Sequence, residues 1–478
     1  MDKLEKLFEN HFNEPVIKMY LMPQSGSYRK YYRIYGKNNT VIGTYNNDKD
    51  ENTAFITFSK HFESQNLPVP HIFAEDLSEN IYLQNDLGNK TLYDYVKQEN
   101  KKGEFSDNLI NKYKEVLKKL IDFQINGAKN LDWEKCYPRK SFDKQSITWD
   151  LNYFKYYMLK ISKTIFNEQL LENDFNTFAN FLTSADSNYF LYRDFQSRNI
   201  MIKDDEIYFI DYQGGRQGAF YYDLASLLYD AKANIPEQIR DQLVDYYFKE
   251  LQTYIKISKT EFFKYYYSFA IIRILQAFGA YGLRGIIEKK LHFLQSIPLA
   301  INNLKYILEN KNIEANIPEL KKALLDFVNN SEFSKENKES NNLTINIKSF
   351  SFIKNGYPKD ESGNGGGFVF DCRFLPNPGR EDKYKFLSGK YSSVIKYLDA
   401  SVEVETFIAN TFILLKEAIN NYIERGFTNL SISFGCTGGQ HRSVYSAERI
   451  KNLIAENYNV NIKIEHENSN NWNTRNTK

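Results

Sequence analysis

The sequence has little cysteine and no long uninterrupted apolar run. Its three cysteines, Cys136, Cys372 and Cys436, are odd in number and form no CxxC pair. This pattern argues against both a disulfide framework and a structural zinc site, and it favours a reducing, cytoplasmic setting. The longest apolar stretch, residues 269–283, carries Arg273 near its middle, so we expect no membrane span.

An excess of charge of one sign is also lacking. The chain has 62 Lys and Arg residues against 60 Asp and Glu residues, a formal net charge of +2. This balance gives no global polycationic signal for nucleic acid, although it leaves a local basic patch open. The length of 478 residues exceeds what one ordinary core supports, so two or three domains are expected.

Residues 329–342 lack aliphatic side chains and contain a single aromatic residue. Such a segment cannot offset its ordering entropy by burial, so we interpret it as a linker between a larger and a smaller part of the chain. A second polar run, residues 467–478, is predicted to be a disordered tail.

A polar loop in the larger part carries a pattern typical of phosphoryl transfer. Residues 188–215 predict short strands around this loop, with a hairpin turn at residues 203–205. Asp194 and Asn199 lie on the loop, and Asp211 closes the strand that follows the hairpin. Phosphoryl transfer needs a carboxylate to accept the proton of the attacking hydroxyl, and an amide oxygen and a second carboxylate to hold Mg²⁺. The alternative is a loop with incidental acids, but Arg-Asp-x4-Asn before a hairpin and a strand ending in Asp is rare, so we favour catalysis.

Four segments of this part resemble one kinase family. They are YRDFQSRNIMI, IDYQGGRQGAFYYDLASLLYDA, QNDLGNKTLYDY and SGSYRKYYRI. The chain resembles the aminoglycoside phosphotransferase/choline kinase family, and within it the AmgK group of anomeric N-acetylmuramate/N-acetylglucosamine kinases. This resemblance implies an α+β, bilobal protein-kinase-like fold, with a small lobe over residues 1–90 and a large lobe over residues 91–328. It also implies ATP as the phosphoryl donor and Mg²⁺ as a cofactor.

The resemblance further implies a role for each polar residue of the loop. Asp194 would be the catalytic base, and Asn199 and Asp211 would be the metal ligands. Asp223 would be a structural acid that braces the loop. The family commonly has His where this chain has Tyr192, a position that is usually architectural.

The small lobe holds candidate nucleotide contacts. A turn between strand-like runs would cover the phosphates, and a polar hinge after a strand would meet adenine. The candidates are Ser25, Gly26 and Ser27 in the turn, and Asp86 and Gly88 in the hinge. On the residues alone, a Ser-Gly-Ser turn is usually just a hairpin, and a plain turn would use the same residues as the hinge.

The strand lysine of protein kinases is absent from this lobe, since TVIGTYNN contains no Val-Ala-Ile-Lys pattern. A cation of the preceding strand must replace it, and Arg29, Lys30 and Arg33 are the candidates. Strand alternation places Arg29 and Arg33 on one face and Lys30 on the other, so only one set can face the cleft. We assign the role to Lys30 or Arg33 and leave the choice between them open. Glu51 would either orient this cation or cap the following helix.

The acceptor site is predicted in the helical half of the large lobe. Asp150 and Arg273 lie on otherwise apolar helical stretches, and Arg198 lies in the catalytic loop. These three residues are candidate contacts for the acceptor, although a structural ion pair is the more common role of a buried arginine. The residues indicate only a hydroxyl acceptor, whereas the resemblance favours an amino sugar phosphorylated at its anomeric hydroxyl.

The smaller part predicts a separate small α/β domain over residues 343–466. Strand-like segments flank an amphipathic helix that stops at Gly426, and a further strand leads into GCTGGQHRS. A strand, a glycine-containing loop and a helix form a phosphate-binding layout, in which backbone N–H groups and an arginine meet the anion. The candidate anion site comprises Arg373, Cys436, Thr437, Gly438, Gly439, Gln440, His441, Arg442 and Ser443.

Three interpretations compete for this loop. Cys436 and Arg442 are spaced as in cysteine-dependent phosphatases, in which a thiolate attacks phosphorus, although Gly435 stands where such loops usually have His. The loop could also bind an anion without chemistry. The third interpretation is a tight turn around a buried cysteine.

Resemblance to a second family favours binding. The segments DCRFLPNPG, GCTGGQHRS and KSFSFIKNGYP resemble the carboxyl-terminal domain of the RapZ RNase adapter proteins, which implies sensing of an amino-sugar phosphate and contact with RNA. RapZ proteins pair this domain with a P-loop domain, and no Gly-x4-Gly-Lys-Ser/Thr occurs here. RNA therefore stays an open partner, because the basic residues of this part could equally be a solvated face.

The sequence as a whole predicts an ATP- and Mg²⁺-dependent kinase for N-acetylated amino sugars, with a fused domain that binds sugar phosphate. Two alternatives stay open. One is a nonenzymatic RapZ-like RNA adapter with a relict kinase fold, and the other is an aminoglycoside or choline-type kinase.

Overall fold

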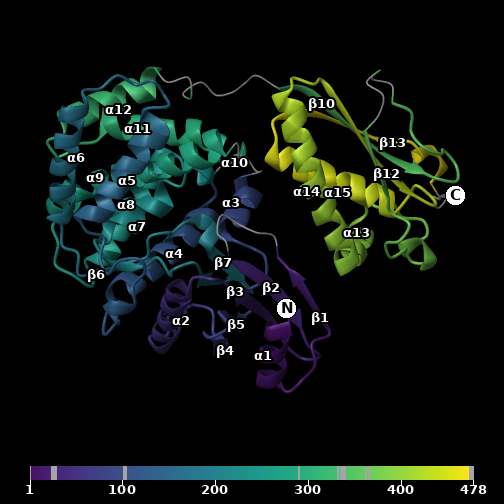
Figure 1. The fold of residues 1–478 in the computed structure, drawn as a ribbon, viewed down its shortest axis with the longest axis horizontal. Helices are drawn as coiled ribbons and strands as arrows, with labels where there is room; N and C mark the ends of the chain where they lie inside the picture. The colour runs from purple at the N-terminus through teal and green to yellow at the C-terminus, as the bar shows by residue number, and fades with distance from the viewer. Residues whose placement is uncertain are drawn as a thin grey trace. The chain divides into compact units, whose positions relative to one another are not determined.

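The computed structural model describes residues 2–22, 29–100, 105–288, 291–330, 333, 341–360, 363 and 367–472. The chain divides into two compact units, Met1–Glu336 and Asn337–Lys478 (Figure 1). Helix α12 (Pro318–Asn330) and strand β10 (Asn341–Ser351) extend into the predicted linker from either side.

The first unit begins with a five-stranded antiparallel sheet in the order β1-β2-β3-β5-β4. Helix α1 packs its Leu4 and Phe8 side chains against Ile34 and Leu83 of this sheet. Helix α2 starts where the Asp48 carboxylate accepts a hydrogen bond from a backbone N–H of the first turn. The elements of this small lobe are α1 (Asp2–Phe12), β1 (Lys18–Leu21), β2 (Lys30–Tyr35), β3 (Thr40–Tyr45), α2 (Lys49–Ser64), β4 (Ile72–Asp76) and β5 (Ile81–Asn85).

The rest of the first unit is a mainly helical large lobe with two short two-stranded sheets, β6-β9 and β7-β8. Its helices are α3 (Leu92–Asn100), α4 (Asp107–Ile125), η1 (Trp133–Lys135), α5 (Lys144–Phe154), η2 (Lys155–Leu159), α6 (Glu168–Thr183), η3 (Ser197–Asn199), α7 (Tyr221–Leu228), η4 (Ala231–Ala233), α8 (Glu237–Leu251), α9 (Lys259–Ala280), η5 (Tyr281–Ile287), α10 (Leu291–Leu294), α11 (Ile297–Asn310) and α12. Its strands are β6 (Tyr189–Leu191), β7 (Ile200–Lys203), β8 (Glu206–Phe209) and β9 (Arg216–Gly218).

The predicted hairpin is confirmed. Strands β7 and β8 pair antiparallel around Asp204 and Asp205, which have positive φ values of 51° and 66°. The segment before the loop, β6, pairs with β9 rather than with the hairpin. The polar loop of residues 192–199 therefore runs between two small sheets.

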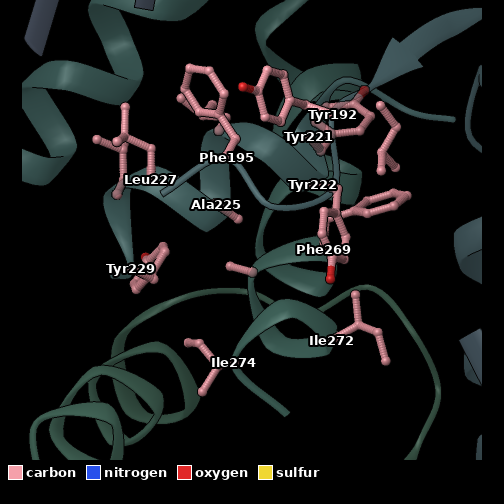
Figure 2. Packing of buried hydrophobic residues seen from close by; sticks show 14 of the residues in the cluster. Tyr192, Phe195, Tyr221, Tyr222, Ala225, Leu227, Tyr229, Phe269, Ile272 and Ile274 are labelled. Carbon is pink, nitrogen blue, oxygen red and sulfur yellow. The ribbon is translucent and has the colours of Figure 1, made fainter. Parts of the chain in front are cut away.

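The core behind this loop is aromatic. Figure 2 shows Tyr192 and Phe195 of the loop in one buried cluster with Tyr221 of α7 and Phe269 of α9. The rings of Tyr192 and Phe195 lie 5.1 Å apart, and those of Tyr221 and Phe269 lie 5.4 Å apart. Within the described residues, only the segment 259–287 is long and apolar enough to cross a membrane by length and composition. That segment is α9 with η5, and α9 packs against α5 and α7 in the core of this unit.

The second unit contains a parallel four-stranded sheet in the order β11-β12-β10-β13. The predicted amphipathic helix is present as α14, and Gly426, with a φ of +67°, follows its end. The elements are β10, β11 (Gly367–Asp371), η7 (Pro378–Arg380), α13 (Ser392–Asp399), α14 (Val402–Glu424), β12 (Asn429–Cys436), α15 (Arg442–Asn457), β13 (Val460–His466) and η8 (Ser469–Asn471).

Candidate functional site

Asp194 lies on a loop whose backbone is supported from behind by Asp223. The buried Asp223 carboxylate accepts hydrogen bonds from the backbone N–H groups of Tyr192, at 2.7 Å, and Arg193, at 3.0 Å. Arg193 has a φ of +81°, a conformation that residues with a side chain rarely adopt and that surrounding contacts must enforce. Burial raises the pKa of Asp223 to about 7. These contacts fit the bracing role expected for Asp223.

Asp150, a predicted acceptor contact, pairs with Arg193 instead. Its two carboxylate oxygens lie 2.7 and 2.8 Å from the Arg193 guanidinium, and Asp150 is only 6% exposed. The guanidinium also lies over the rings of Phe142 and Tyr222. Because a buried arginine needs a counter-charge, these contacts commit Asp150 to the catalytic loop, which corrects its predicted place in the acceptor site.

The Asp194 carboxylate faces a cavity. No donor among the described residues makes a hydrogen bond to it, and its backbone carbonyl accepts one from the Asn199 amide at 2.8 Å. Burial, followed by the charge of Asp211, raises the pKa of Asp194, while Arg193 and Arg273 oppose the rise. A carboxylate in this position can accept a proton from the hydroxyl group of a bound ligand.

Asn199 and Asp211 meet beside this loop. The Asn199 amide nitrogen lies 3.1 Å from Asp211 Oδ2, and Gln213 Nε2 lies 2.8 Å from Asp211 Oδ1. The Gln213 Oε1 atom is buried and has no hydrogen-bond partner in the described part of the chain. Carboxylate and amide oxygens are ligands that Mg²⁺ prefers, so these residues fit the expected ion. No group of three or more His, Cys, Asp or Glu side chains arranged for a metal occurs among the described residues, so the fit rests on one carboxylate with amide oxygens.

A buried cation of the small lobe pairs with the predicted orienting acid. Arg29 Nη2 lies 3.0 Å from Glu51 Oε1 of α2, and Arg29 is 2% exposed. Arg29 also donates to the Tyr31 hydroxyl at 3.4 Å. The pKa of Tyr31 is raised by burial, against the effect of Arg29, and further by the charge of Asp211. The start of β2 therefore lies within electrostatic range of the candidate metal ligands.

The two cations that we assigned to the phosphates have other environments. Lys30 is exposed and lines a surface pocket with Lys3, and strand alternation places it on the face opposite to Arg29. Arg33 holds the hinge, with Nε 2.7 Å from Asp86 Oδ2 and Nη2 3.1 Å from the Gly88 carbonyl. The structure therefore corrects the assignment, because Arg29 makes the helix-glutamate pair expected of the missing strand lysine.

The hinge is also joined to the catalytic hairpin. The Gly88 N–H donates to Asp86 Oδ1 at 2.9 Å. The Asp86 side chain, a predicted adenine contact, is therefore engaged in a local turn. Lys203 Nζ donates to the Asp86 carbonyl at 2.9 Å, and the Ile202 N–H donates to the Lys90 carbonyl at 2.8 Å. Backbone groups of the hinge thus stay the predicted adenine contacts. The predicted flap lies outside the described residues: Ser25, Gly26 and Ser27.

A cavity of about 170 Å³ opens beside Asp194 in the first unit. Its walls come from the catalytic loop, the turn between α7 and η4, helix α9 and the segment around α10. Its charged lining residues are Asp194, Arg198, Asp230, Lys232 and Arg273. Two of the three predicted acceptor contacts, Arg198 and Arg273, therefore line the cavity that the candidate base faces.

In the second unit, the GCTGGQHRS loop joins β12 to α15 at the carboxyl edge of the parallel sheet. The chain leaves the neighbouring strands β10 and β12 in opposite directions across the sheet, and this is where open α/β sheets bind ligands. Thr437 and Gly438 are exposed, and a side-chain carbon added at Gly438 would meet no atom within 4 Å. The loop therefore presents open backbone before the amino end of α15.

Cys436 and Arg442 are used differently from the same residues in a thiol phosphatase. Cys436 is 3% exposed, and its Sγ lies 3.1 Å from Ser443 Oγ and accepts from the backbone N–H three residues further on, at 3.2 Å. Arg442 is 5% exposed, and its Nη1 donates to the backbone carbonyl of Leu375 at 3.1 Å and to that of Arg373. Arg442 thus commits Nη1 to the segment after β11, whereas its buried Nε atom has no hydrogen-bond partner among the described residues. Its predicted role as the anion fork therefore stays a prediction that rests on the remaining donors.

Three other predicted anion contacts are also engaged by the protein. The Gln440 amide donates to the Leu387 carbonyl at 2.9 Å. His441 Nε2 lies 3.0 Å from the Tyr384 carbonyl. The exposed Arg373 side chain pairs with the aspartate two residues before it, at 2.6 Å. The exposed Thr437 and Gly438, together with the unpartnered Arg442 Nε atom, therefore remain the open part of the predicted site within the described residues.

Residues of the predicted tail support this loop. Asn468 is fully buried, and its Nδ2 donates to the Gly438 carbonyl at 2.7 Å. Trp472 Nε1 donates to the Gly439 carbonyl at 2.8 Å. Residues 467–472 are therefore an ordered part of the second unit, contrary to the prediction, because their side-chain donors satisfy carbonyls of the loop.

Both units match known protein families. Residues 23–257 match the model of the phosphotransferase enzyme family, and residues 343–470 match the model of the RapZ C-terminal domain.

Curated relatives are similar to part of the chain. A nucleotide-binding protein of Staphylococcus haemolyticus is 35% identical over 170 residues, which are 34% of this chain and 53% of the relative. A nucleotide-binding protein of Dinoroseobacter shibae is 41% identical over 124 residues, which are 26% of this chain and 39% of the relative. The chain thus spans about half, or less, of the length of these relatives.

Solved structures of kinases are also similar. Choline kinase LicA from Streptococcus pneumoniae is 15% identical, with 60% of this chain and 91% of that chain covered and a TM-score of 0.41. Spectinomycin phosphotransferase APH(9)-Ia, in complex with ADP and spectinomycin, is 13% identical, with 68% and 98% covered and a TM-score of 0.41.

Proposed function

We propose, from the match of residues 23–257 to the phosphotransferase enzyme family and of residues 343–470 to the RapZ C-terminal domain, that the chain is an ATP- and Mg²⁺-dependent kinase of a small hydroxylated acceptor. The observation that carries the proposal is the position of Asp194. Its carboxylate faces a cavity and accepts no hydrogen bond from a described residue, and it lies next to the contact between Asn199 and Asp211. We further propose that the protein acts in the cytoplasm, since its three cysteines are free.

In the proposed reaction, Asp194 accepts the proton of the acceptor hydroxyl while that oxygen bonds to the γ-phosphorus of ATP and ADP leaves. Asn199 and Asp211 would hold Mg²⁺, which when bound neutralises charge on the nucleotide phosphates. Arg29, oriented by Glu51, would contact the same phosphates from the small lobe in place of the strand lysine. Asp223, through the backbone of Tyr192 and Arg193, and Asp150, through the Arg193 side chain, would position the loop without touching the reacting atoms.

We propose an N-acetylated amino sugar as the acceptor, phosphorylated at its anomeric hydroxyl. Two observations support this class. The segment YRDFQSRNIMI resembles the kinases of such sugars. The cavity of about 170 Å³ is also smaller than the roughly 300–1,000 Å³ of sites for drug-sized ligands, which favours a monosaccharide over an aminoglycoside of several rings.

For the second unit we propose binding of an amino-sugar phosphate, whose level it reports to the kinase. The support is the open backbone at Thr437 and Gly438, just before α15, because the first turn of a helix offers N–H groups to an anion. Kinase activity that does not change with saturating glucosamine 6-phosphate would contradict the regulatory part of this proposal.

The kinase proposal is tested by measuring ADP release from ATP across sugars, amino alcohols and aminoglycosides. The expected result is turnover that depends on an N-acetylated amino sugar and is lost in Asp194→Asn. If no acceptor stimulates turnover, the kinase proposal fails. Salt-sensitive RNA binding in the absence of turnover would then favour the nonenzymatic RNA adapter.

A further inference from the structure

The cavity beside Asp194 is surrounded by more positive than negative charge. Arg198, Lys232 and Arg273 line it, and besides Asp194 its acid is Asp230. Asp230 is already engaged, because its carboxylate accepts a hydrogen bond from the Ser197 hydroxyl at 2.7 Å and from the Lys232 backbone N–H at 3.2 Å. The cavity therefore has three cations and two carboxylates, and one of these carboxylates, Asp230, already accepts two hydrogen bonds.

Two of these cations lack a counter-ion. Arg198 and Lys232 each have exposed surface and line the cavity, and neither side chain forms an ion pair with a described residue. Burial, followed by the charge of Arg198, lowers the pKa of Lys232, and Asp230 only partly opposes the effect. Like charges that face each other in this way are relieved when an anion binds between them.

The third cation lies deeper in the same wall. Arg273 is 5% exposed, and it donates to the Ser226 hydroxyl at 2.8 Å and to the Gln276 side-chain oxygen at 3.0 Å. Both partners are neutral, and no carboxylate among the described residues lies within ion-pair distance of Arg273. Its charge therefore adds to the positive potential inside the cavity, where low-dielectric walls concentrate the field.

The candidate nucleotide contacts lie elsewhere. Arg29, Asp86, Asn199 and Asp211 do not line this cavity. The catalytic loop supplies Arg198, whereas Lys232 comes from η4 and Arg273 from α9, on the side of Asp194 that the acceptor would occupy. The positive charge therefore faces the acceptor.

We propose that the acceptor carries an anionic substituent, a carboxylate or a phosphate, which Arg198 and Lys232 bind while its hydroxyl faces Asp194. This inference rests on the proposed kinase function and adds the charge of the acceptor to it. A cationic acceptor, such as choline or an aminoglycoside, would meet three positive charges at close range and bind poorly.

The test uses the full-length chain and compares four acceptors that have the same sugar ring. They are N-acetylmuramate, with a carboxylate; N-acetylglucosamine 6-phosphate; neutral N-acetylglucosamine; and cationic glucosamine. We expect kcat/KM for one of the anionic sugars to exceed that for the neutral sugar by about ten- to hundredfold, the range given by charged hydrogen bonds. The better of the two anionic sugars identifies the substituent as a carboxylate or a phosphate.

Substitutions assign this preference to the cavity. Lys232→Met and Arg198→Gln are each expected to lower the ratio of kcat/KM between anionic and neutral sugars about tenfold, chiefly through KM. Lys232→Arg should restore most of the ratio. Lys118→Met is the matched control, because Lys118 is exposed on α4 and does not line the cavity; it should keep the wild-type ratio.

Two outcomes would overturn the inference. One is a wild-type preference for the neutral or the cationic sugar. The other is an equal loss for all sugars in Lys232→Met, which would mean that its charge serves the transferred phosphoryl group. Calorimetric binding of N-acetylmuramate to the wild type and to Lys232→Met separates the two proposals. Charge-dependent binding without turnover would refute the kinase alone, whereas turnover without charge discrimination would refute this inference alone.

Discussion

Replacement of Asp150 by Asn would keep the size of the side chain but remove the counter-charge of Arg193. In the native protein the two residues form two hydrogen bonds of 2.7 and 2.8 Å, with Asp150 6% exposed. Arg193 is enclosed by the rings of Phe142 and Tyr222, so water cannot readily replace the lost carboxylate. The variant would therefore contain a largely buried cation without a carboxylate partner.

We expect this change to lower the free energy of unfolding by about 3–5 kcal/mol, the usual cost of breaking a buried ion pair from one side. The lower end is favoured, because Arg193 also donates to the Tyr222 hydroxyl at 2.8 Å. The matched control is Asp245→Asn, which breaks the exposed pair with Lys259. That change should cost less than about 1 kcal/mol.

The measurements are urea unfolding of the full chain, with the m-value compared between variants, and acceptor kinetics. Because Arg193 directly precedes Asp194, kcat of Asp150→Asn should fall, while KM for the acceptor should stay close to that of the wild type. Unchanged stability together with a raised acceptor KM would refute this reasoning. It would return Asp150 to the acceptor site that the sequence predicts.

Further predictions concern the base, the phosphates and the second unit. Asp194→Asn should lower kcat by about 10²–10⁴-fold in an ADP-release assay. The reaction requires ionised Asp194, whose pKa is raised by burial, so kcat should fall with decreasing pH through a pKa above that of a free aspartate; an acid limb at the ordinary aspartate value would contradict this. Arg29→Met should raise KM for ATP about tenfold or more, whereas Lys30→Met should leave it unchanged; the reverse result would restore the sequence-based assignment. Gly438→Asp should abolish calorimetric binding of glucosamine 6-phosphate, whereas Gly438→Ala should not, since the added carbon meets open space; equal loss in both variants would show that loop geometry, and not charge, is responsible.

Features set by neighbouring residues could be predicted from the sequence. The hairpin after the catalytic loop is encoded by alternating apolar residues around Asp204 and Asp205, and it formed where predicted. The contact between Asn199 and Asp211 follows from that hairpin, which returns the chain to the loop. The exposed turn at Gly438 similarly follows from its place between a strand and a helix.

Pairings between distant segments could not be predicted. Asp150 and Arg193 are 43 residues apart, and their charges fit equally well in an acceptor site or in an ion pair until the packing of α5 is known. On the sequence, Arg29, Lys30 and Arg33 are all candidates, and only the position of α2 decides which of them meets Glu51. Periodicity alone contains no information on such tertiary contacts.

The carboxyl-terminal part illustrates a different limit. A polar composition predicts disorder because few apolar groups are available for burial. Asn468 and Trp472 are nevertheless ordered, since each donates a hydrogen bond to a carbonyl of the glycine-containing loop. The signal that could have found them is the side-chain donor of each residue, which matters only when an unsatisfied acceptor lies nearby.

The bond from Lys203 to the Asp86 carbonyl and the bond from Ile202 to the Lys90 carbonyl have a mechanical consequence. They join the hinge to the same hairpin that lies between Asn199 and Asp211 in the sequence. A nucleotide bound at the hinge and at these ligands would contact one connected structural unit at both ends. The distance between the adenine site and the phosphate site would therefore be fixed. Opening and closing of the nucleotide site would then require movement of the strands that precede the hinge. These strands could move without changing the distance between the adenine site and the phosphate site.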